Sequence, residues 1–452
     1  MGTSSSTGAG SLGRVVIVGA GSAGCVLAAR LSEHPGAHVT LLEAGHDLRP
    51  DATPAAIAGP SFVDAMALPD RTWPGLLATR AAGQAPRVYV RGRGVGGSSA
   101  INAMVALRGR PDDYDEWVGR YGCTGWGWAE LGPCFDGAAL ELHRAPRIEW
   151  GAMSRALAEA VPSAAAGVLL TRSATGRRVS AADAYLEPAR GRANLEVRAG
   201  ASVDRVLWRD RRAVGVRLAD GSELAADTVI VAAGAIHSPA LLLRSGVDTP
   251  GVGDNLHDHP SFPIALQRRE PADVRGLPIA TVAAMSSGLD DHGVDDLQLL
   301  PIDHVEVTMP GLSLLMAALM FSHSRGSVGL AGDDPTLDPL VEFRMLEDDR
   351  DWARMERALD AAERALDHPA MRAVGDVVPF DRSRDAVAAA LGDYVHAAGT
   401  CAMGTVVDTS CRVVGYEGLL VCDASVMPQV PRANTHWPVV AIAERLSQLL
   451  TS

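Results

Sequence analysis

The sequence of 452 residues contains no lysine, so all 41 of its basic side chains are arginine. We attribute this bias to GC-rich coding rather than to function. The 54 acidic residues give a formal net charge of −13, which disfavours a nucleic-acid-binding role. With 47% hydrophobic residues, the chain can bury the large core of an ordinary soluble globular protein.

Cysteines and long apolar runs are also scarce. The six cysteines form no C-x-x-C pair and no zinc-ligand spacing, so we expect reduced thiols, a cytoplasmic protein and no bound metal. No apolar run is long enough to cross a membrane. Residues 1–13 lack the basic and apolar regions of an export signal, and we expect them to form a disordered tail.

Residues 14–45 contain the first clear motif, a strand, a glycine turn, a helix and a second strand. Gly19, Gly21 and Gly24 form G-x-G-x-x-G directly after an apolar strand. The first glycine makes the turn, the second lets a pyrophosphate approach the backbone, and the third allows close packing of helix on strand. Glu43 ends the second strand, where a carboxylate can bind a ribose hydroxyl. This pattern predicts a dinucleotide site without distinguishing FAD from NAD.

Further elements of the same kind lie far along the chain. Residues 228–246 again read as strand, glycine turn and helix, and residues 418–428 as strand and turn. The turn residues within 218–224 predict a hairpin. Residues 348–366 predict an amphipathic helix with a solvated outer face.

We therefore predict an α/β fold with a discontinuous Rossmann-like domain and an inserted domain. The dinucleotide-binding domain comprises residues 14–132, 186–261 and 393–452. Residues 133–185 and 262–392 lack the strand, turn and helix pattern. They are expected to form an inserted α+β substrate-binding domain, whose antiparallel sheet covers one face of the cofactor.

Five ordered blocks carry a family resemblance. They are the glycine motif near residue 19, "YVRGRGVGGSSAINAMVALRGRPDDYDEW" (89–117), "AAGAIHSPALLLRSG" (232–246), "GVGDNLHDHP" (251–260) and "GLLVCDASVMPQVPRANTHWP" (418–438). Together they resemble the glucose-methanol-choline (GMC) oxidoreductases, a family of FAD enzymes, from about residue 14 to the end. The resemblance thins in the inserted segments. It implies FAD as the cofactor and a fold like that of p-hydroxybenzoate hydroxylase.

The resemblance also implies which residues bind FAD. The expected set is Gly19, Gly21, Ser22, Ala23, Gly24, Glu43, Ala44, Gly96, Gly97, Ser98, Asn102, Ala103, Met104, Val105, Val203, Asp423, Ala424, His436 and Trp437. The small residues at 96–99 would pass the pyrophosphate and isoalloxazine, because bulky side chains would collide with them. The main chain of Val203 would meet adenine, and Asp423 with Ala424 would lie beside the ribityl chain. Trp437 is expected either to wall the pocket or to pack on the final helix.

One position differs from several family members. Those members link FAD covalently through a histidine directly before the asparagine that corresponds to Asn102. Ile101 occupies that place here. We therefore expect FAD to bind noncovalently.

Two histidines match the catalytic positions of the family. His396 in "HAAGT" corresponds to the catalytic base, and His436 in "NTHWP" to a second active-site position. A neutral imidazole suits proton removal near physiological pH. Because His436 precedes a helix whose amino end disfavours positive charge, we assign it as substrate orienter and His396 as base. His257 and His259 are expected to form a satisfied loop pair rather than a metal site.

These features predict an FAD-dependent alcohol oxidase or dehydrogenase. It would take a hydride from the CH–OH carbon of a small-molecule alcohol to flavin N5 and pass electrons to oxygen or another redox carrier. One alternative is a flavin-containing lyase or photoenzyme of the same family, without net redox turnover. Another is a flavoprotein that acts only as a partner for other proteins.

Overall fold

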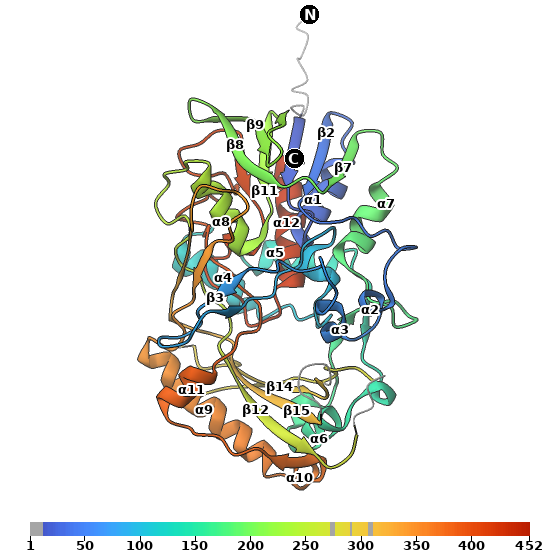
Figure 1. Ribbon diagram of the computed structural model, residues 1–452, viewed down its shortest axis with the longest axis vertical. Helices are drawn as coiled ribbons and strands as arrows, with labels where there is room; N and C mark the ends of the chain where they lie inside the picture. Colours follow the sequence, from blue (N-terminus) through green and yellow to red (C-terminus); the bar gives the residue numbers. More distant parts are fainter. Residues whose placement is uncertain (1–11, 272–275, 290–291, 306–310) are drawn as a thin grey trace, which may run out of the picture.

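The computed structural model describes residues 12–271, 276–289, 292–305 and 311–452. The described chain forms two lobes stacked along its long axis (Figure 1). The first eleven residues of the predicted tail lie outside the described part of the chain. The expected boundary of the tail was wrong at Gly13, which is the first residue of a strand and pairs with Ala37.

The upper lobe in Figure 1 is built on a five-stranded parallel sheet. Its strands, in spatial order, are β19 (Leu419–Val421), β11 (Thr228–Val231), β1 (Gly13–Val18), β2 (Ala37–Glu43) and β7 (Leu195–Ala199). Each neighbouring pair is parallel. The central strands read as continuous apolar runs because both faces of a parallel sheet are buried.

Helices and a second sheet cover this parallel sheet. The helix α1 (Ser22–Leu31) packs against β1, β2 and the last helix, α12 (His436–Thr451), while α8 (Gly234–Arg244) follows β11. A three-stranded antiparallel sheet of β8 (Val203–Arg209), β9 (Arg212–Leu218) and β10 (Glu223–Ala225) contacts β11 through β9. The β9–β10 pair is the hairpin that the sequence predicts.

The segment around Val203 is divided between two sheets. The chain turns at Gly200, whose φ is +69°, a conformation that favours glycine. Residues before the turn belong to β7 of the parallel sheet, whereas Val203 begins β8 of the antiparallel one. The two strands therefore belong to different sheets.

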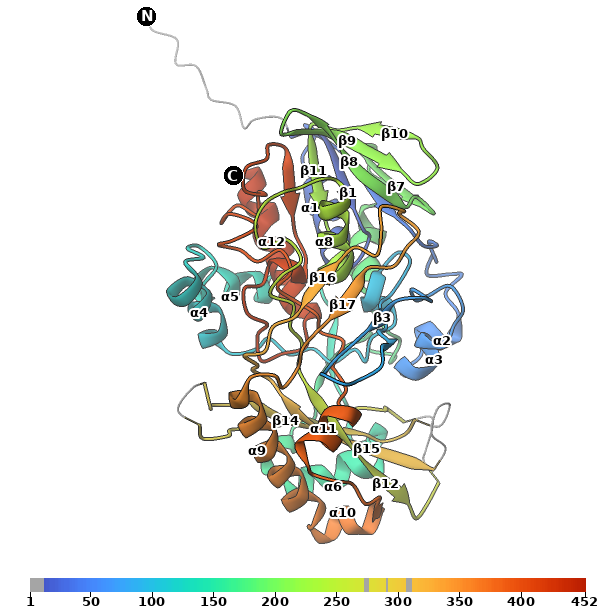
Figure 2. The same cartoon turned by 60° about the vertical axis from the view of Figure 1, so that its left-hand side comes forward.

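The lower lobe contains a five-stranded antiparallel sheet (Figure 2). Its strands, in spatial order, are β13 (Ala283–Met285), β14 (Leu297–Ile302), β15 (Leu312–Leu319), β12 (Ser261–Arg268) and β18 (Gly375–Val377). The helix α9 (Asp349–Leu366) packs on β14 and β15, and α10 (Pro369–Val374) packs on α6 (Ala152–Ala160). Both the predicted α/β fold and its separate antiparallel sheet are confirmed.

The helix α9 matches the amphipathic helix predicted for residues 348–366, but its charges are not all solvated. Arg354 and Asp351 are buried. The guanidinium of Arg354 donates to the buried carboxylate of Asp296 at 3.0 Å. The inner face of α9 thus carries paired charges as well as apolar residues.

The remaining elements are short. The helices are α2 (Ala55–Ala58), α3 (Phe62–Met66), α4 (Pro111–Tyr121), α5 (Trp128–Asp136), α7 (Glu187–Ala189) and α11 (Arg384–Ala390). The strand pairs are β3 (Leu77–Ala78) with β4 (Arg87–Val88), β5 (Leu142–Arg144) with β6 (Leu169–Thr171), and β16 (Ser327–Gly329) with β17 (Leu340–Glu342).

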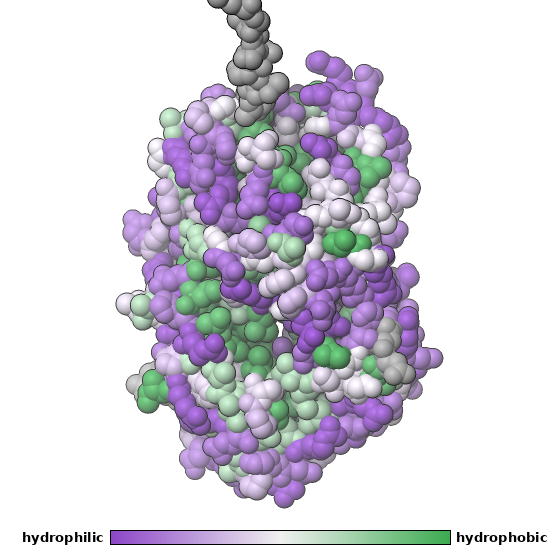
Figure 3. Space-filling view, turned by 180° about the vertical axis from the view of Figure 1, so that it is seen from behind, coloured by the Kyte–Doolittle hydropathy of each residue, from purple (hydrophilic) through white to green (hydrophobic). Residues whose placement is uncertain are grey.

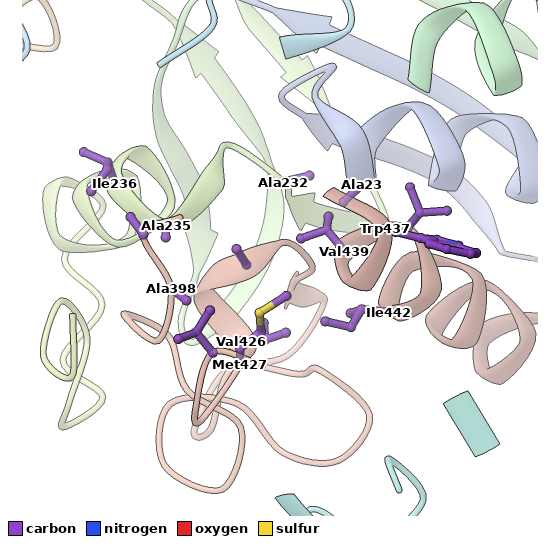
Figure 4. Packing of buried hydrophobic residues seen from close by; sticks show 14 of the residues in the cluster. Ala23, Ala232, Ala235, Ile236, Ala398, Val426, Met427, Trp437, Val439 and Ile442 are labelled. Atoms are coloured by element: carbon purple, nitrogen blue, oxygen red, sulfur yellow. The ribbon is translucent and has the colours of Figure 1, made fainter. Parts of the chain in front are cut away.

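Two apolar clusters hold the lobes together. The main core runs from the space between the parallel sheet and its helices into the lower lobe, where Ile264, Leu315 and Met355 belong to it, and Figure 4 shows its part around α8 and α12. A second cluster joins Met104 and Val105 to Ile279, Leu300 and Met316. Because these residues come from both lobes, their burial stabilises the junction between them.

Candidate active site

A cavity of about 740 Å³ lies at the junction of the two lobes. Its upper wall is formed at the carboxyl ends of the parallel strands, where open α/β sheets bind their ligands. Its lower wall includes Leu300 and Ile302 of β14 and Met316 of β15. From behind, apolar residues gather in a hollow between the lobes (Figure 3).

The glycine turn after β1 leaves room on the cavity side. Gly19 and Gly21 line the cavity, and a Cβ on Gly21 would meet no atom of the described residues within 4 Å, apart from its neighbours in the chain. Gly24 lies behind the turn, where a Cβ would stand 1.8 Å from the carbonyl oxygen of Gly19. The turn therefore fits an elongated phosphate-bearing ligand on one side and close packing on the other.

Two buried carboxylates form hydrogen bonds that hold the loops around the cavity in place. Glu43 accepts hydrogen bonds from the main-chain N–H groups of Ala20 (3.0 Å), Gly45 (2.9 Å) and Gly94 (2.9 Å). In the same way, Asp423 accepts hydrogen bonds from Gly234 N–H (2.8 Å), the Ser238 hydroxyl (2.6 Å) and Ser425 N–H (2.8 Å). Both residues line the cavity, so each one shapes the loops that a dinucleotide would contact.

The loop before Asn102 crosses the cavity next to the glycine turn. A Cβ on Gly97 would stand 2.7 Å from the Cα of Gly21, so the two loops touch through glycines. The side-chain oxygen of Asn102 accepts from Met104 N–H (2.9 Å) and from the Arg178 guanidinium (2.9 Å). The buried Arg178 thus fixes the loop from behind.

Most of the predicted site residues line this one cavity. Those that do are Gly19, Gly21, Ser22, Ala23, Glu43, Ala44, Gly97, Ser98, Asn102, Ala103, Met104, Val105, Val203, Asp423, Ala424, His396 and His436. Gly24, Gly96 and Trp437 are not among the lining residues.

The structure places Trp437 away from the cavity. Its ring lies 4.5 Å from the guanidinium carbon of Arg108 and makes an edge contact with Phe135, with centroids 5.6 Å apart. It follows His436 by one residue, and one residue is a rotation of about 100° in an α-helix. His436 therefore lines the cavity. Trp437 packs beside the helix (Figure 4).

The two predicted catalytic histidines both line the cavity and both are buried. Nε2 of His396 lies 3.3 Å from the side-chain amide of Asn434, and its Nδ1 lies 3.0 Å from Nδ1 of His259. Nδ1 of His436 lies 2.8 Å from the Ser22 hydroxyl, and its Nε2 has no hydrogen-bond partner among the described residues.

Burial sets the charge of both imidazoles. It lowers the pKa of His396 well below its usual value of 6.5 and lowers the pKa of His436 to about 4. Both side chains are therefore neutral near pH 7. A neutral imidazole can accept a proton, which a protonated one cannot.

His259 makes a contact that the sequence does not predict. Of the expected loop pair, His257 does behave as a satisfied structural residue: its Nε2 accepts from Val430 N–H at 2.8 Å, and its Nδ1 lies 2.6 Å from the Asn255 carbonyl oxygen. His259 instead meets His396, which is 137 positions away in the chain. No local pattern could have indicated this contact.

The fold and the cavity define an α/β dinucleotide-binding oxidoreductase. A family model described as GMC oxidoreductase matches residues 14–261 with its amino-terminal part and residues 322–443 with its carboxy-terminal part. The chain belongs to the GMC oxidoreductase family, as its five motifs predict. The family and its FAD-dependent structural neighbours support FAD as the cofactor.

Similar proteins cover nearly the whole chain. A 5-(hydroxymethyl)furfural oxidase from Methylovorus sp. is 31% identical, with 96% of this chain and 98% of the relative covered. An oxygen-dependent choline dehydrogenase from Burkholderia ambifaria is 31% identical, with 96% and 92% covered. The solved structure of pyridoxine 4-oxidase from "Mesorbium loti" is 30% identical with a TM-score of 0.87, covering 97% of this chain and 99% of that one.

Among the described residues, no helix combines the length and the apolar character that crossing a membrane requires.

Proposed function

We propose that this protein oxidises the CH–OH group of a small-molecule alcohol, with FAD bound noncovalently in the cavity between the lobes. The observation that carries this proposal is the presence of two buried, neutral histidines in the wall of a cavity that also contains the glycine turn. Bound FAD supplies the acceptor for the hydride that leaves the carbinol carbon, at its N5 atom.

The residues around the cavity fit this cofactor. The open side of Gly21 and the first turn of α1 are suited to the pyrophosphate, because a helix amino end stabilises negative charge. Glu43 lines the same cavity, and we assign its carboxylate to a ribose hydroxyl. Asn102 and the residues after it form the wall nearest the second apolar cluster, and we assign the isoalloxazine to this wall.

His396 would remove the hydroxyl proton of the alcohol at Nε2. Its neighbour Asn434 presents an amide donor to the same nitrogen, so this nitrogen holds a lone pair rather than a proton. His436 begins α12, whose positive amino end disfavours an imidazolium. We therefore assign His436 to orienting the substrate, and its unpartnered Nε2 is available for that hydrogen bond.

The lower wall of the cavity indicates the kind of alcohol. Ile279, Leu300, Ile302 and Met316 line it, and the described residues from 261 to 319 place no charged side chain on the cavity. We propose an uncharged alcohol with an apolar body, because burying an unpaired cation against this wall would be costly. The electrons then pass to oxygen or to another redox carrier.

We also propose a cytoplasmic location. All six cysteines lie buried as free thiols, which is the usual state of cysteine in a reducing compartment.

Anaerobic mixing of the FAD-loaded protein with a panel of alcohols tests this function. Benzyl alcohol and 5-(hydroxymethyl)furfural should bleach the oxidised flavin band faster than choline does. His396→Ala should retain FAD but bleach at least about 100-fold more slowly, which is the usual loss when a general base is removed. Release of an aldehyde without bleaching would instead favour the lyase alternative, and unchanged bleaching in His396→Ala would exclude this histidine as the base.

A further inference from the structure

The two ring nitrogens of His396 contact different side chains. Nε2 faces the Asn434 amide, whereas Nδ1 lies 3.0 Å from Nδ1 of His259. The two imidazole rings are nearly perpendicular, at 85°, with centroids 5.2 Å apart. This geometry aims one ring nitrogen of His259 at one ring nitrogen of His396, behind the cavity wall.

The position of the protons follows from the donors and acceptors. In a neutral pair, only one of the two facing Nδ1 atoms can carry the shared proton. The Asn434 amide nitrogen is a donor only, so Nε2 of His396 is unprotonated. A neutral His396 then carries its proton on Nδ1 and donates it to the Nδ1 lone pair of His259.

We infer that His259 is a positioning residue that selects the tautomer of His396, by accepting the Nδ1–H bond and so keeping Nε2 unprotonated, so that the substrate hydroxyl can take the place of the Asn434 amide at this nitrogen. This inference rests on the proposed function in one respect: it takes Nε2 of His396 as the basic atom. His259 itself does not line the cavity, so it acts only through His396.

A single carboxylate holds the two histidines at this distance. Asp258 accepts from the main-chain N–H of His259 at 2.6 Å, from that of His396 at 2.8 Å, and from the Tyr89 hydroxyl at 2.7 Å. The Tyr89 oxygen in turn accepts from Ala397 N–H at 3.0 Å. The loops that carry the two imidazoles are therefore tied to one buried anchor.

Asp258, His259 and His396 are also residue types that bind metal ions. The ligand atoms of Asp258, His259 and His396 lie within 4.8 Å of one another. However, the two Nδ1 atoms face each other, and the carboxylate already accepts from four donors, the fourth being Tyr394 N–H at 3.4 Å. Hydrogen bonds thus account for the cluster without an ion.

The orienting partner here is neutral rather than an anion. In a Ser-His-Asp triad, a carboxylate selects the tautomer and also stabilises the imidazolium. Burial instead lowers the pKa of His259 to about 3, and it lowers the pKa of His396 as well. The positive charge of Arg91 acts on His396 in the same direction, and that of Arg432 on His259.

Further side chains and backbone groups lie next to His259 and His396. The ring of Tyr394 makes edge contacts with both imidazoles, and Asp258 lies against their main chains. The backbone groups of Pro431 and Met320 favour the protonated form of His259, but less strongly than burial disfavours it. His396 should consequently stay neutral, and active as a base, well below pH 6.5.

Three variants of the FAD-loaded protein test this role by the pH dependence of flavin reduction. His259→Ala should slow reduction about 10- to 100-fold with FAD content retained, as losses of orienting partners do. His259→Asn offers a neutral acceptor and should recover most of the rate. His259→Asp places an anion beside His396. The anion should raise the pKa of His396, and with it the pH at which the rate falls on the acidic side of the profile, by about 1 unit or more.

His257→Asn is the matched control, because it alters a buried histidine of the same loop that does not touch His396. It should lower the melting temperature and leave the pH profile in place. Wild-type rates and an unmoved acidic limb in both His259→Ala and His259→Asp would overturn the inference. If His259→Ala does not fold, the inference is decided by the pH at which flavin reduction slows on the acidic side in His259→Asp.

Nitrogen-15 NMR of the histidine rings gives a readout that does not depend on turnover. The His396 signals, assigned by their loss in His396→Ala, should have a protonated Nδ1 and a bare Nε2. His259→Ala should replace this single tautomer by a mixture. A proton on Nε2 in the wild type would refute the inference even in an active enzyme. If instead no alcohol reduces the flavin, the proposed function fails while the NMR result still decides the tautomer.

Discussion

Ile101 occupies the position at which several family members carry the histidine that is linked to FAD. The residue is buried against Ile57, Ala65 and Ala100, and its aliphatic side chain has no atom that could form a bond to the flavin. We therefore predict that acid or heat denaturation, followed by ultrafiltration, moves all the yellow colour into the filtrate. A covalent flavoprotein treated in the same way serves as the control and should keep its colour with the polypeptide. Flavin retained by the denatured chain would contradict noncovalent binding.

At the residue scale, motifs can locate side chains that meet a ligand but not side chains that meet each other. His396 and His436 belong to short patterns, and both line the cavity. His259 could not be assigned from the sequence because its partner belongs to a distant loop. Trp437 was placed in the cofactor set although the turn of the helix carries it to Phe135.

At the scale of elements, the turn between β1 and α1 contains two glycines that differ in the space around them. A Cβ at Gly24 would collide with the main chain, whereas a Cβ at Gly21 would enter open space. Gly24→Ala should therefore lower the melting temperature of the apoprotein. Gly21→Ala should leave that temperature within about 2 °C and yet weaken FAD binding at least tenfold, because the methyl group would occupy the path of the cofactor.

Calorimetry of both apoproteins and titration with FAD distinguish these effects. Gly21→Ala serves as the matched control for Gly24→Ala, since both changes add one methyl group to the same motif. Equal loss of melting temperature in the two variants would show that Gly21 also has a packing role. Wild-type FAD affinity in Gly21→Ala would remove this glycine from the cofactor site.

Local patterns predicted individual elements better than their pairing. The hairpin of β9 and β10 and the helix α9 follow from turn residues and apolar spacing. The pairing of β12 with β18 joins Leu266 to Val377 and has no local signature. The buried charges of α9 were also unexpected, because Asp296 lies on a different segment from Arg354.

At the scale of the whole molecule, buried histidines should make the protein sensitive to acid. Burial lowers the pKa of five of them: His237, His257, His259, His396 and His436. In the unfolded chain each regains a pKa near 6.5, so the unfolded state binds more protons below that pH. Stability is therefore fully present above about pH 6.5 and is lost as the pH falls toward 4.

Buried acids oppose part of this effect, among them Asp113, whose pKa burial also raises. Burial raises the pKa of Asp258 to about 7 and of Asp303 to about 6, so the folded state binds these protons first. The five histidines outnumber these acids, so the unfolded state still binds more protons near pH 5 and stability should fall with a measurable slope as the pH is lowered. Urea unfolding of the apoprotein at pH 7, 6 and 5 measures this slope. Constant stability over that range would contradict it.

The contact between the two ends of the chain also affects how the protein is made. Ser22 meets His436 and Arg30 meets Glu444, each pair separated by 414 positions, and α1 packs directly on α12. While the ribosome is still translating, α1 therefore lacks the surface that will bury it. The lobe can close only after α12 has left the exit tunnel, so this face of α1 stays exposed until then.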